Sequence, residues 1–125
     1  MSAHLANVTF DCEDALTVAR FWSAVLDRPI SDTPEPSSGF ACIGTVDHAD
    51  AGSPTWLFQR VPEHRTAKNR VHVDLAAADR EAEVARLLAL GARRLDDKDE
   101  FGFRWTIMAD VEGNEFCLAQ EPAQG

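Results

Sequence analysis

Basic residues are scarce in this chain of 125 residues. It has 12 Lys and Arg against 21 Asp and Glu, which gives a formal net charge of −9. Nucleic-acid binding depends on neutralising phosphates with Lys and Arg, and no basic stripe offsets the acidic balance. We therefore expect no nucleic-acid partner. The surplus of carboxylates either attracts a cationic ligand or simply keeps the protein soluble.

Cysteines and long apolar runs are also few. The three cysteines, Cys12, Cys42 and Cys117, form no CxxC pair, and their number is odd. The chain does not begin with a basic and then apolar leader, and no stretch reaches the ~18–20 apolar residues of a membrane helix. We therefore expect a cytoplasmic protein with reduced thiols, no membrane association and no disulfide framework.

What remains is an ordinary globular composition, with 45% hydrophobic and 26% charged residues. Domains cluster near ~100–150 residues, so the length fits a single domain. A chain of this size buries about two-thirds of its unfolded surface, which is enough for a core without disulfide or metal staples.

The first half of the chain contains the period-two pattern of a strand and the apolar stripe of a helix. Residues 5–12 alternate apolar and polar side chains, which predicts a half-buried strand. Residues 15–26 carry apolar residues along one helical face. Residues 40–46 and 55–61 then predict two strands, separated by the turn-rich stretch 47–54.

The same order of elements returns in the second half. Residues 70–76 predict a strand, and residues 81–90 predict a helix with Gly91 as its C-terminal cap. Residues 103–110 and 115–120 predict two further strands.

The two halves can be superposed as an internal repeat. Asn7 falls on His72, and Asp14 falls on Asp79 beside each helix start. A Val-Ala-Arg triplet lies in both predicted helices. The alternative is that two unrelated halves coincide by chance.

This repeat predicts an α+β fold made of two tandem modules within one domain. The modules span about 5–62 and about 70–122, and the polar stretch 63–69 links them. In each module one sheet face is apolar, to suit its helix, and the other is mixed.

Five stretches carry a resemblance that covers nearly the whole chain: 10–14, 21–26, 58–63, 68–75 and 110–118. Together they resemble the vicinal oxygen chelate superfamily of glyoxalase and bleomycin resistance-like proteins, especially its small glyoxalase-like branch. The resemblance implies two βαβββ modules that form an incomplete barrel around a cavity, and a homodimer.

The resemblance also implies a test for metal binding. Catalytic members hold a divalent metal at four strand positions, typically with His or Gln, Glu, His or Gln, and Glu. These positions are here Asn7, Leu57, His72 and Cys117. Only His72 is a good ligand, and Cys117 is a second candidate for a soft metal. We therefore expect no four-ligand metal site and no resident cofactor; a divalent metal is the alternative.

Acid–base chemistry without a metal is a further hypothesis for the same cavity. His72 paired with Asp74 or Glu115 would carry proton transfers, because imidazole titrates near neutral pH. The alternative is that His72 is a polar wall residue. Cys117 is either a nucleophile or an inert cysteine. The residues that we expect to line the cavity are Asn7, Asp11, Trp56, Leu57, Gln59, Trp105 and Cys117.

Three functions stay open at this point. The first is binding of a small molecule, hydrophobic or cationic, in the cavity. The second is a metal-dependent lyase or isomerase, or a dioxygenase, of the same superfamily. The third is an oligomeric accessory protein without a ligand, marked by a cavity packed shut by Trp56, Leu57 and Trp105.

Overall fold

The computed structural model describes residues 3, 5–44 and 54–122. The chain divides into two compact units, unit 1 with residues 1–64 and unit 2 with residues 65–125, and each is described by itself. The end of the strand predicted for 40–46 and most of the turn predicted for 47–54 lie outside the described residues.

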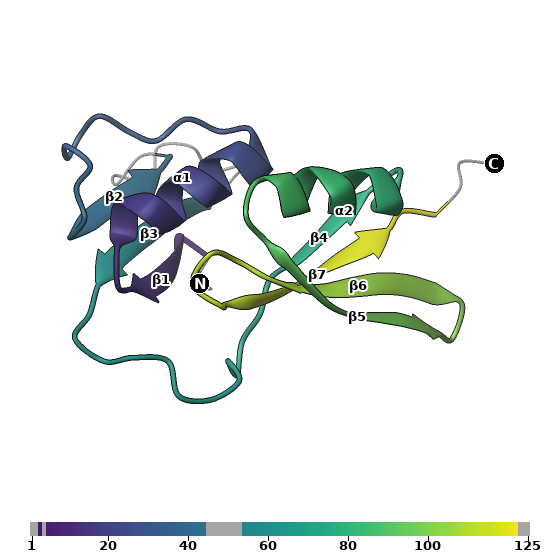
Figure 1. Ribbon diagram of the computed structural model, residues 1–125. Coiled ribbons are helices and arrows are strands. Elements are labelled where there is room, and N and C mark those ends of the chain that lie inside the picture. The colour runs from purple at the N-terminus through teal and green to yellow at the C-terminus, as the bar shows by residue number, and fades with distance from the viewer. Residues whose placement is uncertain (1–2, 4, 45–53, 123–125) are drawn as a thin grey trace. The chain divides into compact units, whose positions relative to one another are not determined.

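Unit 1 contains one helix and a three-stranded sheet (Figure 1). Its elements are β1 (Asn7–Cys12), α1 (Ala15–Leu26), β2 (Phe40–Ile43) and β3 (Thr55–Arg60). The strand order is β1-β3-β2, with β1 parallel and β2 antiparallel to the central strand β3.

Local sequence explains where α1 begins and ends. The Asp14 carboxylate accepts a hydrogen bond from the backbone N–H of Thr17 at 3.1 Å, which caps the first turn. At the other end Asp27 adopts a left-handed conformation, and its backbone N–H bonds to the Ser23 carbonyl. The predicted bounds of this helix, 15–26, are confirmed.

Aromatic rings form the core of unit 1. Trp22 of α1 is fully buried, and its ring centroid lies 5.4 Å from that of Phe10 and 5.2 Å from that of Trp56. Trp56 is only 8% exposed. Because it faces α1, Trp56 belongs to the core rather than to the cavity wall that the sequence predicted.

Unit 2 contains one helix and a four-stranded sheet. Its elements are β4 (Asp74–Ala77), α2 (Arg80–Ala89), β5 (Arg93–Glu100), β6 (Phe103–Ala109) and β7 (Glu115–Gln120). The strand order is β4-β7-β6-β5, in which only the β4–β7 pair is parallel.

The two units repeat one topology. In each, the first strand runs parallel to the last strand, and the last strand pairs antiparallel with the one before it. An isolated antiparallel bridge between Ile30 and Ile43 occupies in unit 1 the place that β5 has in unit 2. The predicted α+β fold is confirmed, and both sheets are open.

Strand β5 is an element that the sequence did not predict. It is mostly exposed and strongly charged (Arg-Arg-Leu-Asp-Asp-Lys-Asp-Glu), so no apolar alternation marks it. It forms an edge strand, where charged side chains are common because they discourage pairing with other chains. A tight turn with positive φ at Phe101 and Gly102 connects it to β6.

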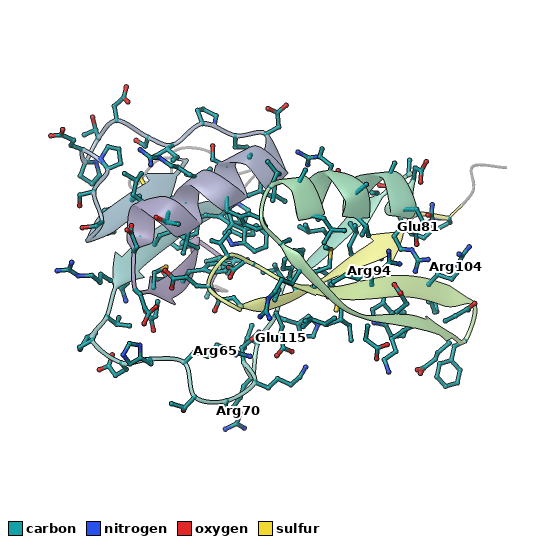
Figure 2. The ribbon with its side chains drawn as sticks, viewed as in Figure 1. Arg65, Arg70, Glu81, Arg94, Arg104 and Glu115 are labelled. Atoms are coloured by element: carbon teal, nitrogen blue, oxygen red, sulfur yellow. The ribbon has the colours of Figure 1, made fainter. Side chains whose placement is uncertain are left out.

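Ion pairs stabilise this charged edge. The Arg94 guanidinium donates hydrogen bonds to Glu81 of α2 at 2.9 Å and to Asp97 of β5 at 2.8 Å; Arg94 and Glu81 are labelled in Figure 2. These bonds lower the pKa of both carboxyl groups below the ordinary range.

The strand predicted for 70–76 begins four residues too early. β4 starts at Asp74, and Val71 is 82% exposed. Pairing with β7 begins only at the Asp74–Cys117 pair although β7 itself starts at Glu115, because the Asn69 side chain accepts from the Glu115 N–H and donates to the Glu115 carbonyl. The side chain of Asn69 also donates to the Val71 carbonyl at 2.8 Å, so a local turn replaces the sheet there. His72 therefore precedes the strand.

No helix in the described part of the chain combines the length and the apolar character that crossing a membrane requires.

Candidate functional site in unit 2

A pocket of about 420 Å³ lies on one face of the unit 2 sheet. The side chains of Thr106, Met108 and Leu118 alternate along the strands with those of the wall; they are at most 1% exposed and form the layer toward α2. The pocket therefore lies on the face opposite the helix, as alternation along the strands requires. All of its lining residues belong to unit 2.

The wall of the pocket is mainly apolar. Phe103, Trp105 and Ile107 contribute from β6, and Ala119 contributes from β7. Trp105 pairs with Ala119 in the strand register, so a large and a small side chain stand next to each other. An apolar wall of this kind with a few polar groups is the usual form of a small-molecule site.

One corner of the pocket gathers three groups that can donate to a ligand. His72 Nε2 lies 3.4 Å from Asp74 Oδ1, and one ligand atom from each of His72, Asp74 and Cys117 lies within 4.8 Å of the others. Asp74 and Cys117 are direct register partners on β4 and β7. We call these three residues the donor corner.

The surroundings of Cys117 favour the protonated form of its thiol. Burial raises the pKa of this thiol, and the Asp74 carboxylate raises it further through its charge and its hydrogen bond with the thiol. A thiolate is the reactive form of cysteine. The surroundings of Cys117 in the free protein thus disfavour the nucleophilic role.

Glu115 is engaged by two cations. Its carboxylate accepts hydrogen bonds from Arg65 at 2.8 Å and from Lys68 at 3.0 Å; Arg65 and Glu115 are labelled in Figure 2. The Lys68 bond is the main reason that the pKa of Glu115 is lowered. A carboxylate held in this way is a poor general base, so its role is to fasten the segment 65–69 to β7. Asn69 strengthens that attachment, because its side chain accepts from the Glu115 N–H at 3.1 Å.

We expect Glu115→Gln to loosen this segment. A neutral amide loses both charge-assisted bonds, so trypsin should cleave after Arg65 and Lys68 several-fold faster in the native state. Because the folded-state pKa lies below the ordinary value of 4.5, the attachment is present above that value and is lost as the pH falls through the folded-state pKa. Limited proteolysis read by mass spectrometry measures the effect, and Glu112→Gln is the control. Equal cleavage in the Glu115 variant and the parent would refute the assignment.

The structure divides the predicted site residues between the units. His72, Asp74, Trp105, Glu115 and Cys117 all line the pocket of unit 2.

Four other predicted residues, Asn7, Asp11, Leu57 and Gln59, lie on β1 and β3 of unit 1. There Gln59 donates to Asp11 at 2.8 Å, so these two side chains bond to each other. The Asn7 side-chain oxygen is buried without a hydrogen-bond partner in the part of the chain that the structure describes.

Sequence reasoning missed several residues of the pocket. Phe103 and Ile107 share the strand parity of Trp105, and this alternation could have identified them. Lys68 could not have been found in this way, because it lies in a segment without regular structure. The missed lining residues are Lys68, Phe103, Arg104, Ile107, Phe116, Ala119 and Gln120.

The four ligand positions implied by the superfamily are not filled by four metal ligands. Asn7 offers only an amide, and Leu57 offers no donor atom. A catalytic zinc site generally uses three protein ligands. The residues at these positions therefore do not fit the metal site of the catalytic members.

Several known structures share the fold of this protein. A glyoxalase/bleomycin resistance protein/dioxygenase family enzyme from Burkholderia phytofirmans PsJN superposes with a TM-score of 0.74 at 17% identity, over 94% of this chain and 98% of that one. The fosfomycin resistance protein FosX from Mesorhizobium loti gives 0.70 at 16% identity, over 98% and 95%. "Oxidase ChaP-H2" gives 0.61 at 15% identity, over 100% and 98%. The fold is thus that of the glyoxalase/bleomycin resistance/dioxygenase superfamily.

The sequence itself gives the narrower assignment. Residues 7–119 match the family described as "Glyoxalase-like domain", so the chain belongs to that family within the vicinal oxygen chelate superfamily. The resemblance seen in the sequence is confirmed. Among curated proteins, none matches this chain.

Proposed function

We propose that this protein binds a small molecule with an aromatic or aliphatic body in the pocket of unit 2. The observation that carries the proposal is the pocket of about 420 Å³, whose apolar wall ends at the polar donor corner. A ligand there would bury its apolar part against Trp105 and place a polar group beside Asp74. Burial of apolar surface contributes roughly 25 cal/mol per Å², so Trp105 should supply much of the affinity.

At the donor corner the Asp74 carboxylate favours a neutral or cationic ligand; the cationic side chains of Lys68 and Arg104 also line the pocket. Glu115 is neutralised by Arg65 and Lys68, whereas the Asp74 side chain is 69% exposed and pairs with the imidazole of His72. An ammonium group placed at the donor corner would meet the Asp74 carboxylate directly. The acidic net charge of −9 acts in the same direction.

A matched pair of probes tests this proposal. 1-Naphthylmethylamine and 1-naphthalenemethanol share one aromatic body and differ in charge, and calorimetric titration measures their affinities for the metal-free protein. We expect Trp105→Ala to weaken both at least tenfold and Asp74→Asn to weaken only the amine. Leu88→Ala, which removes a side chain on the helix side of unit 2, should leave both unchanged. Equal binding by the parent and Trp105→Ala would refute the proposal.

A second candidate function is proton transfer on the bound molecule. It rests on the 3.4 Å separation of His72 Nε2 and Asp74 Oδ1, because a carboxylate beside an imidazole orients the ring for proton transfer. In a substrate screen, His72→Gln should abolish any turnover while keeping the naphthyl probe affinity within twofold. Turnover that survives this substitution would rule out the role.

The apolar wall around an open pocket supports ligand binding over the alternative of an accessory protein with a closed cavity. The homodimer and the cytoplasmic location stay predictions, and analytical ultracentrifugation measures the first of them.

A further inference from the structure

We propose that His72, Asp74 and Cys117 form a site for one thiophilic divalent cation of the Zn²⁺ class, built within unit 2 alone. The superfamily set implied by the sequence combines positions of both modules, and two of them, Asn7 and Leu57, supply no suitable ligand here. Asp74 occupies none of those four positions. The proposed site therefore shares His72 and Cys117 with the superfamily set, replaces the other two positions by Asp74, and does not depend on the proposed small-molecule function.

The distances between the three donors approach those of a metal centre. Two ligands about 2.0 Å from a tetrahedral ion are about 3.3 Å apart. His72 Nε2 and Asp74 Oδ1 are 3.4 Å apart. All three donor atoms lie within 4.8 Å of one another, so rotation of side chains could bring the sulfur into range.

The backbone fixes two of the three donors. Asp74 and Cys117 are register partners on parallel strands, and the Cys117 N–H donates to the Val73 carbonyl at 3.0 Å. Their side chains consequently point to the same face of the sheet. His72 lies two residues before Asp74, outside the strand.

The kind of donor selects the kind of metal. A thiolate, an imidazole and a carboxylate together match Zn²⁺ or Co²⁺, whereas Mg²⁺ and Ca²⁺ prefer sites made only of oxygen. Binding replaces the S–H bond of Cys117 by a sulfur–metal bond, and the proton passes to the solvent. Three protein ligands leave a fourth position for water or for a polar group of a pocket ligand.

The internal repeat supplies a comparison inside the same chain. Thr9 pairs with Leu57 in unit 1 as Asp74 pairs with Cys117 in unit 2, and Asn7 stands two residues before Thr9 as His72 stands before Asp74. The three equivalent side chains of unit 1 are thus Asn7, Thr9 and Leu57. None of them is a strong ligand for zinc, so we expect one ion per chain.

Thiol labelling of the full chain tests the site without any activity assay. Cys12 and Cys42 are buried and Cys117 is partly exposed, so a disulfide reagent such as dithiobis(nitrobenzoic acid) should label one thiol in the native protein. One equivalent of Zn²⁺ should slow this labelling at least tenfold. Co²⁺ should add a sulfur-to-metal absorption band in the near ultraviolet, which Cys117→Ser should abolish.

Matched substitutions distinguish Zn²⁺ binding at the proposed site from nonspecific Zn²⁺ binding elsewhere on the protein. In Zn²⁺ titrations Cys117→Ser, His72→Ala and Asp74→Asn should each weaken binding at least tenfold. Asp11→Asn on β1 and His64→Ala, which change exposed residues of unit 1, should keep it within twofold. Unchanged labelling with stoichiometric Zn²⁺, or equal losses in Asp11→Asn and Asp74→Asn, would overturn the proposal. Naphthyl probe binding after chelator treatment tests the small-molecule function separately.

Discussion

Replacing Trp22 by alanine should lower the free energy of unfolding by about 3–5 kcal/mol, the range measured for large aromatic side chains removed from cores. Trp22 is fully buried and contacts the rings of Phe10, Phe21 and Trp56, so its removal opens a cavity bounded by rigid rings. Such rings refill a cavity poorly. Denaturant unfolding followed by circular dichroism measures the loss.

Two further variants make this prediction specific. Trp22→Phe keeps one ring in the core and should lose distinctly less stability than alanine. Arg20→Ala changes an exposed position of the same helix and should stay within about 0.5 kcal/mol of the parent. A loss below about 1 kcal/mol for Trp22→Ala would show that this side chain does not hold the core together.

The second large loss of stability is expected from a substitution in the turn between β6 and β7. Asp110 is 2% exposed, and its Oδ1 accepts from the backbone N–H groups of Glu112 and Asn114, both at 2.9 Å. The Asn114 side chain donates to Oδ2, also at 2.9 Å. The backbone itself closes the turn, with Gly113 in a positive-φ conformation and its N–H bonded to the Asp110 carbonyl.

Asp110→Ala should therefore cost about 2–3 kcal/mol, because hydrogen bonds to a charged group are worth more than neutral ones and the donors would lose their buried acceptor. Asp110→Asn retains one acceptor oxygen and should lose less. Asp99→Ala, an exposed position on β5, is the control.

Local readouts would connect this turn to the pocket. Hydrogen exchange at the Glu112 and Asn114 amides should accelerate in Asp110→Ala. The same turn leads into β7, which carries Glu115 and Cys117, so thiol labelling of Cys117 should also change. Undiminished amide protection in this variant would contradict the role given to Asp110.

Several parts of the fold could be predicted because local chemistry sets them. The helix 15–26 has an apolar face and a capping aspartate, and both act within a few residues. The repeat could also be seen, since Asp14 and Asp79 cap the two helices in the same way.

The predictions that were wrong concern features set by contacts between residues far apart in the chain. β5 is a strand because β6 lies beside it, and its charged sequence carries no apolar pattern. His72 precedes β4, which begins only at Asp74, because the Asn69 side chain bonds to the Glu115 backbone of the partner strand. The prediction that Trp56 lines the cavity is wrong. Because side chains alternate along a strand, Trp56 lies on the face opposite Leu57, toward the helix, where its ring contacts those of Trp22 and Phe10.

The sequence alone determined the family, the α+β fold and the poor match to the superfamily's metal ligands, because each of these depends on the identity of residues along the chain. Only the tertiary structure decided that Asp74 and Cys117 stand opposite each other beside His72, and that Arg65 and Lys68 fasten their segment to Glu115. The physical reason is that strand pairing brings together residues far apart in the chain, such as Asp74 and Cys117, and no local pattern encodes that register.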